Sequence, residues 1–213
     1  MAARASAQET LVDEGTLVIS RNGVPVGREA YRIVQAAAGG GQAYRATATI
    51  SFDTLRISLR LTTDSAGAPL TYEAEVRSRG VLAAHVDGSG RPGRFSILAK
   101  TPHGEAAHDY VMGTNPLLLD ANAFDPYFFA ALPPLKPQFS VIDPRSGAQA
   151  TFRFEERGQE AIRVGRSTVS ARHFALLTPS GASRDIWVNE QGRLLRVAIP
   201  AQGLVAQRDE APR

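Results

Sequence analysis

The stretch from Gly113 to Gln138, GTNPLLLDANAFDPYFFAALPPLKPQ, decides the fold because it interrupts a chain that otherwise predicts one β-strand after another. It holds five of the thirteen prolines and three of the nine phenylalanines. Asp125 and Pro126 predict a helix start, with Asp125 as N-cap, and Pro133-Pro134 ends the helix. A helical plug near residues 120–133, of about two turns, is unstable in isolation, so we expect it to lie against a sheet.

The chain before this stretch shows the cleanest strand pattern. In residues 55–61 the apolar residues Leu55, Ile57 and Leu59 alternate with polar ones. Residues 44–52 alternate in the same way, and their inner face is lined by small side chains. A period of two indicates strands with one buried and one solvated face, and the small residues leave room beneath a lid.

Further strands are predicted on both sides, with turn signals about every eight to twelve residues. Before the central stretch they lie near residues 15–20, 24–35, 44–52, 55–61, 70–79, 81–86, 95–100 and 107–112. After it they lie near residues 139–142, 150–156, 160–166, 168–177, 185–189, 194–199 and 204–207. The predicted fold class is all-β, with either one strongly curved antiparallel sheet (a half-barrel or open barrel) or two sandwiches.

One curved sheet is favoured because the central stretch is too apolar for a solvated linker. Left outside, Tyr127 and its two phenylalanine neighbours would expose several hundred Å² of aromatic surface. We therefore expect one β domain over residues 14–207, with 113–138 as a central insert. Residues 1–10 and 208–213 are expected to be tails, and fraying is expected from Ala206 onward.

The amino-acid composition limits the classes of binding partner that we expect. The 24 basic and 21 acidic residues give a net charge of +3, and only Lys100 and Lys136 are lysine. The arginines reflect either a codon bias or an anion-facing surface. Because they are spread along the whole chain, we expect no nucleic-acid partner. No apolar run approaches the roughly 20 residues of a membrane helix, so we expect no integral membrane segment, and a monomer or weak homodimer.

The first residues bear on the compartment. Ala5-Ser6-Ala7 before Gln8 has the small-x-small form of a signal-peptidase site. We therefore expect a periplasmic or secreted protein whose signal peptide has been removed; an ordinary small-residue tail is the alternative. The chain has no cysteine, which excludes a disulfide framework, a thiolate metal site and a cysteine nucleophile.

No motif in the sequence indicates a reaction. Residues 88–93, GSGRPG, have the dinucleotide-binding spacing, but alternating residues follow instead of a helix, so they predict a hairpin turn. We find neither a G-x-S-x-G serine elbow nor a P-loop. His103 and His108 flank a turn and have carboxylates beside them. We expect them to be exposed loop residues, and the alternative is that they bind zinc. We expect no catalytic residue, metal or cofactor, while enzymatic activity stays open.

Three segments together resemble a known family. They are GTLVISRNGVPVGREAYRI near the start, LLLDANAFDPYFFAAL in the middle and DIWVNEQGRLLRVAIP near the end. In this order they resemble a family of exported bacterial proteins of unknown function. Such proteins are similar in shape to the LolA/LolB-type half-barrels, which carry lipids or lipoproteins across the envelope. The resemblance implies a half-barrel fold and an envelope location, and it transfers no catalytic residue.

The function hypothesis follows from the insert. We expect a carrier that holds an apolar or amphipathic, lipid-like ligand between the curved sheet and the central segment. A structural or partner-binding protein with a filled core is the alternative, and Trp187 could be either core or groove wall. The predicted ligand-binding residues are Phe124, Tyr127, Phe128, Leu132, Leu55, Ile57, Leu59 and Trp187.

Overall fold

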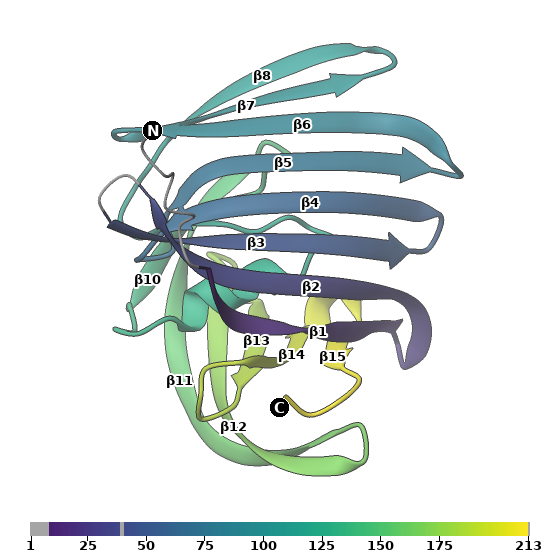
Figure 1. Ribbon diagram of the computed structural model, residues 1–213, viewed down its shortest axis with the longest axis vertical. Helices are drawn as coiled ribbons and strands as arrows, with labels where there is room; N and C mark the ends of the chain where they lie inside the picture. Colours follow the sequence, from purple (N-terminus) through teal and green to yellow (C-terminus); the bar gives the residue numbers. More distant parts are fainter. Residues whose placement is uncertain (1–8, 39–40, 213) are drawn as a thin grey trace, which may run out of the picture.

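The computed structural model describes residues 9–38 and 41–212 (Figure 1). Its fifteen strands join one sheet in the order β8-β7-β6-β5-β4-β3-β2-β1-β15-β14-β13-β12-β11-β10-β9. Every neighbouring pair is antiparallel except β9 and β10, which are parallel. The predicted all-β fold with one strongly curved, open sheet and a short helix is confirmed. The Ala5-Ser6-Ala7 motif lies outside the described residues.

The first half of the sheet contains β1 (Thr10–Arg21), β2 (Val24–Ala38), β3 (Gly41–Phe52), β4 (Leu55–Asp64), β5 (Pro69–Ser78), β6 (Val81–Arg91), β7 (Arg94–Thr101) and β8 (Gly104–Val111). The second half contains β9 (Pro116–Leu118), β10 (Gln138–Ile142), β11 (Gln149–Val164), β12 (Ser167–Leu177), β13 (Ser183–Val188), β14 (Leu194–Ile199) and β15 (Leu204–Arg208). Two 3₁₀ helices, η1 (Asp125–Ala131) and η2 (Pro200–Gln202), complete the secondary structure of the described chain.

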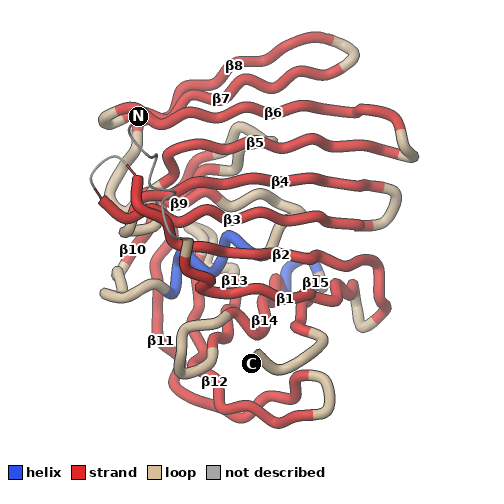
Figure 2. The backbone as a smooth tube through the Cα atoms, viewed as in Figure 1, coloured by secondary structure: helices blue, strands red, loops and turns tan. Residues whose placement is uncertain are grey.

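The sheet curls because antiparallel strands twist progressively with each neighbour. The strands of the first half lie side by side, and β9 to β15 wrap beneath them (Figures 1 and 2). The two edge strands, β8 and β9, do not pair with each other. Instead Gln149 Nε2 donates a hydrogen bond of 2.7 Å to the carbonyl of Val111, which ties the start of β11 to the end of β8.

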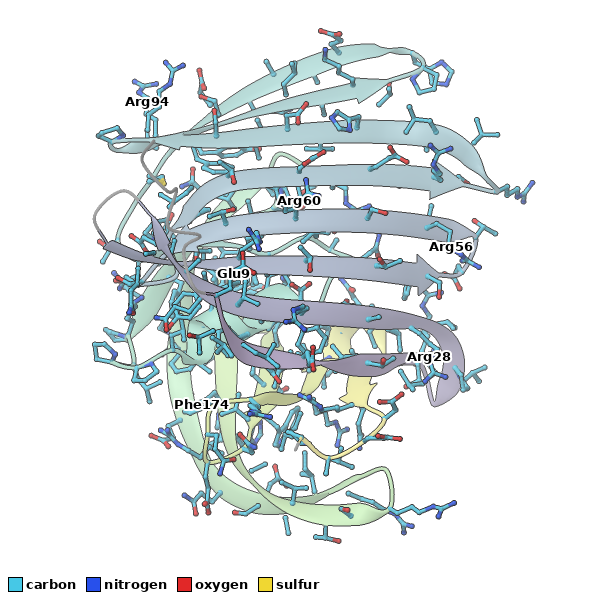
Figure 3. All side chains as sticks on the ribbon, in the orientation of Figure 1. Glu9, Arg28, Arg56, Arg60, Arg94 and Phe174 are labelled. Atoms are coloured by element: carbon cyan, nitrogen blue, oxygen red, sulfur yellow. The ribbon has the colours of Figure 1, made fainter. Side chains whose placement is uncertain are left out.

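The two faces of the first half differ as the alternation predicts. Ile57 and Leu59 are buried in the main core, whereas Arg56 and Arg60 of the same strand are exposed. On the outer face Arg60 pairs with Glu73 at 2.7 Å, and Arg28 pairs with Asp209 at 2.7 Å. Figure 3 labels the two arginines on their strands. Many of the arginines are therefore neutralised by neighbours on the sheet.

Strand β11 joins two segments that were expected to be separate strands. Residues 150–156 and 160–166 were expected to be two strands, but they form the single strand β11, with a bulge between Glu156 and Gly158. Gly158 adopts a φ of 101° there, a conformation that glycine tolerates best.

A second, smaller core lies outside the main one. The far parts of β11 and β12 share this apolar cluster with β13 and β14, and its members are Ile162, Val164, Ala171, Trp187, Leu195 and Ala198.

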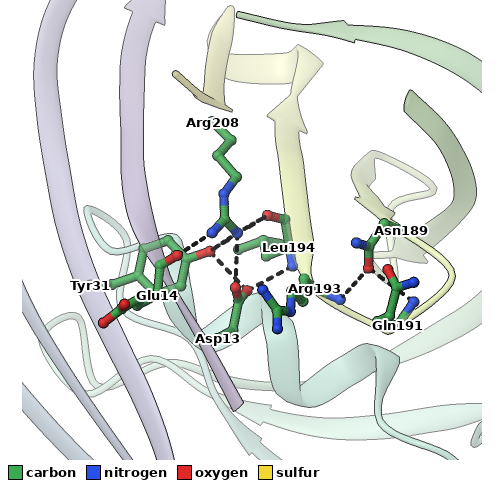
Figure 4. A network of polar contacts seen from close by, with 8 residues as sticks. All are labelled: Asp13, Glu14, Tyr31, Asn189, Gln191, Arg193, Leu194 and Arg208. Atoms are coloured by element: carbon green, nitrogen blue, oxygen red, sulfur yellow. Dashed lines mark hydrogen bonds and ion pairs between the residues drawn. The ribbon is translucent and has the colours of Figure 1, made fainter. Parts of the chain in front are cut away.

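A buried polar network joins the two halves of the sheet (Figure 4). Arg208 Nη1 donates to Asp13 Oδ1 at 2.8 Å and to the Tyr31 hydroxyl at 2.9 Å, and Asp13 also accepts the backbone N–H of Leu194 at 2.9 Å. Arg208 is 5% exposed. The expectation of a fraying tail from Ala206 is therefore wrong, since these contacts hold β15 to the rest of the sheet.

Two further boundaries differ from the expectation. The turn predicted over residues 88–93 is shorter, because β6 continues to Arg91 and glycines 88 and 90 lie within it. These glycines allow close packing: a Cβ at Gly88 would lie 2.8 Å from the Phe95 ring. The parallel strand β9 within the central segment was not predicted, since three residues are too few to show a period.

Core burial predicts a large cost for truncation on β4. We expect Leu59→Ala to reduce the free energy of unfolding by roughly 2–5 kcal/mol, because the substitution removes buried methyl groups and leaves a cavity. Leu70→Ala is the control, since Leu70 is 40% exposed. Urea denaturation measures both variants. Equal denaturation midpoints for Leu59→Ala and the parent would contradict the burial of this face.

Candidate functional site: the central segment and its buried carboxyl groups

Residues 113–138, the central segment, run through the inside of the curved sheet. Its helix η1 contacts β3, β9, β13 and β14, and all seven of its residues are buried. The helix is of the 3₁₀ type and has no side-chain cap. The predicted N-cap is therefore wrong: Phe124 occupies that position, and Asp125 is the first helical residue. Its carboxyl group is buried beside Glu29 of β2 instead.

Aromatic side chains attach the helix to the first half of the sheet. The Tyr44 ring meets Phe128 and Phe129 edge to face, at centroid distances of 6.2 Å and 6.0 Å. Such pairs contribute beyond their buried area. The β4–β5 turn contacts the same helix, because a Cβ at Gly67 would lie 3.3 Å from Phe129 Cβ. Lys136 donates to the carbonyl of Ala66 in this turn.

Most of the predicted ligand-binding residues gather in this region. Phe124, Tyr127, Phe128, Leu132, Ile57 and Leu59 belong to the main core, and partly buried Leu55 packs against it. None of the four from the central segment is more than 9% exposed. In this conformation the central segment itself fills the place where a ligand is expected.

Trp187 lies apart from the other predicted residues, in the second core. Its indole stacks on the His173 ring at 4.3 Å and donates through Nε1 to Glu160 at 2.6 Å. The guanidinium of Arg196 lies 4.8 Å from the centroid of the indole ring. Its neighbours Ile186 and Val188 face the main core, so strand alternation separates Trp187 from the central segment.

A carboxyl group on β2 holds the start of the helix. Glu29 is fully buried, and its two oxygens accept the backbone N–H groups of Phe124 at 2.8 Å and Asp125 at 2.6 Å. These N–H groups belong to the first turn, where a helix has no internal acceptor. Glu29 therefore performs from another strand the role that a capping side chain would perform locally.

The carboxyl group of Asp125 is buried beside Glu29. No donor of the described chain reaches either of its oxygens. Burial raises the pKa of Asp125 to about 7, and burial together with the nearby Asp125 charge raises the pKa of Glu29 well above its ordinary value. A proton shared by the pair removes one buried charge and supplies a hydrogen bond, so the two groups titrate as a unit.

Two more polar contacts surround the segment. The Tyr72 hydroxyl donates to Asp120 at 2.7 Å, and the same carboxylate forms an ion pair with Arg145. On the other side Arg184 donates to the Tyr127 hydroxyl at 3.0 Å. Side chains from β5 and β13 thus hold the chain before the helix at Asp120 and the first turn of the helix at Tyr127.

Sequence reasoning missed these polar partners. The signal for Glu29 was present: it occupies an inward position of β2, two residues before buried Tyr31 and four before buried Ile33. A charged residue at an apolar position of an alternating strand indicates a buried, partnered group. Asp120 and Arg145 had no such signal, because they lie in irregular chain.

Other candidate features lie elsewhere. His103 and His108 lie on the β7–β8 hairpin, and no group of three potential ligands in the described chain could hold a metal ion. A cavity of about 490 Å³ is lined by Leu11, Glu14, Thr16, Arg193 and Arg208, outside the central segment. No helix among the described residues has the length and apolar character to cross a membrane.

The acid pair predicts a pH dependence of stability. The folded-state pKa of Asp125 is raised from 3.8 to about 7, so the folded state binds more protons than the unfolded state between these values. The contribution of the pair to stability should therefore be greatest below about pH 4. The free energy of unfolding should fall by up to about 4 kcal/mol as the pH rises from there through 7. Urea titrations at several pH values measure this fall, and Asp125→Asn should reduce it.

Glu190→Gln is the control, because it removes one exposed carboxylate. Its stability should follow the pH dependence of the parent. If the stability curve of Asp125→Asn were also parallel to that of the parent, the pair would not titrate as described.

Comparison with known proteins agrees with this fold. Residues 127–207 match a family model described as a domain of unknown function, DUF6134, and no curated protein matches the chain. A crystal structure of a β-barrel-like protein of domain of unknown function DUF1849 from Brucella abortus is similar, with a TM-score of 0.56. The two sequences are 11% identical, and the similarity covers 96% of each chain. At this identity the likeness shows that the chain has a β-barrel-like fold.

Proposed function

We propose that the protein binds an apolar or amphipathic, lipid-like molecule on the concave face of the sheet, in the place that the central segment fills. The segment then acts as a lid that closes on its own groove when no ligand is bound. The sequence resembles a family similar in shape to the LolA/LolB-type half-barrels, which carry lipids or lipoproteins. This resemblance favours a lipid-like ligand. A location in the periplasm, suggested by Ala5-Ser6-Ala7, is part of the same proposal.

The observation that carries the proposal is the buried carboxyl group of Asp125. Apart from the proton that it can share with Glu29, this carboxyl has no donor among the described residues, and burying two adjacent acids in an apolar core lowers stability. A segment needed only to fill a core would be more stable with an apolar or amide residue at this position. Buried acids with raised pKa values are concentrated at functional sites.

The contacts of the lid can be replaced by those of a ligand. Phe128 and Leu132 make apolar contacts without hydrogen bonds, so an alkyl chain could occupy the same volume with little change in buried area. Tyr127 and Arg184 form the polar contact beside them. If the lid moved away, Arg184 would lose this partner and could bind a polar or anionic head group.

A second candidate function rests on a different observation. The central segment residues predicted to contact a ligand are at most 9% exposed, as in an ordinary closed core. In that case the protein is a structural or partner-binding β domain without a ligand, and the acid pair only weakens the attachment of the segment.

Phe128→Ala separates the two functions. If the segment is a lid, the parent should bind the apolar dye N-phenylnaphthylamine, and the variant should alter that affinity at a moderate cost in stability. If the segment is closed core, the variant should lose roughly 3–5 kcal/mol of stability, and no dye binding should occur in either protein. Fluorescence titration and urea denaturation measure the two quantities.

Ile162→Ala is the matched control, since it opens space in the second core, away from the segment. It should leave dye binding unchanged. Mass spectrometry of organic extracts from the purified parent provides an independent measurement. A parent that binds no dye and yields no extractable lipid would overturn the carrier proposal.

A further inference from the structure

Four hairpin turns of the first half of the sheet lie in a row at one end of the molecule, on the right in Figure 1. We call them the tip row: residues 21–24, 53–56, 79–82 and 102–103. Three of them are joined by direct contacts: Arg21 pairs with Asp53 at 3.3 Å, and the Arg79 N–H donates to the carbonyl of Thr54 at 3.1 Å. These three turns therefore form one surface.

The tip row exposes aliphatic side chains where turns ordinarily carry polar ones. Val24 is 63% exposed, Val81 69% and Leu82 43%. Val81 and Leu82 follow directly after the glycine of the β5–β6 turn, so they project at the end of the hairpin. Burial of these groups against an apolar phase would be favourable, and nothing in the described chain covers them.

The charge of the tip row is positive. Arg21 pairs with Asp53 at 3.3 Å, but no carboxylate pairs with Arg56 or Arg79 in the part of the chain described. On the outer face of the sheet, in contrast, Arg28, Arg60 and others are paired. Figure 3 shows Arg56 at the tip end of the sheet and Arg94 at the opposite end.

We propose that the tip row docks on an anionic lipid surface. Aliphatic side chains at the ends of the hairpins would enter the boundary between head groups and acyl chains, and Arg56 and Arg79 would contact lipid phosphates. The tips carry no Phe, Tyr or Trp, so they lack the large stacking platforms typical of single-stranded nucleic-acid sites. This docking surface is independent of ligand binding under the central segment.

Vesicle co-sedimentation tests the proposal with the full chain. The parent should bind vesicles of mixed phosphatidylglycerol and phosphatidylcholine and ignore phosphatidylcholine alone. In Arg79→Asn/Val81→Ser the partition coefficient should fall by about tenfold or more. Asparagine suits the positive φ of 49° at residue 79, and both side chains are exposed, so we expect the variant to fold.

The matched control is Arg91→Asn/Val111→Ser, because both residues lie at the opposite end of the sheet and Val111 is 65% exposed. It should bind vesicles as the parent does. Equal losses in the two double variants would overturn the assignment to the tip row. Binding of the parent to a soluble polyanion but not to vesicles would overturn the lipid assignment. Circular dichroism and thermal unfolding confirm that all three proteins are folded.

Discussion

A carboxyl group on the inner face of β2 accepts the first two free N–H groups of a helix nearly one hundred residues away. This contact matters because a chain that passes through an apolar interior must leave no backbone donor without a partner. Neither Phe124 nor Asp125 offers a local cap. Glu29 thus lets an irregular, proline-rich segment lie inside the sheet, where its aromatic residues complete the core.

The same contact limits how firmly the segment is held. Packing of Tyr44 against Phe128 and Phe129 favours the docked state, as does the ion pair between Asp120 and Arg145. Two buried acids beside each other oppose it, and this opposition grows as protons leave the pair. If the segment is a lid, as proposed, this balance of favourable apolar packing against unfavourable electrostatics would allow its release.

The sequence was sufficient to predict what depends on regular alternation. Leu59 and its apolar neighbours face inward and Arg60 faces outward, because the period of two transfers directly to a sheet with one buried face. The burial of Phe128 was predictable from its hydrophobicity alone. The role of Asp125 was not: an aspartate before proline predicts a cap by local rules, and here a distant strand supplies that cap. The period of two also could not show that Trp187 lies in a separate core, because it gives no sign that β11 and β12 pack with it on the outer face.

The two ends of the first half of the sheet differ in what lies against them. At one end the β4–β5 turn contacts the central segment through Gly67 and Ala66. At the other end lie the hairpin turns of the tip row (Figure 1). The first of them donates a backbone hydrogen bond from Asn22 to Gly203, whereas Val81 of the β5–β6 hairpin is 69% exposed. In the two proposals, the central segment inside the sheet would serve ligand binding and the tip row at one end would serve attachment to a surface. Substitutions of Val81 and of Phe128 should therefore have additive effects on the free energy of unfolding, because Val81 is exposed at the tip row and Phe128 lies in the main core.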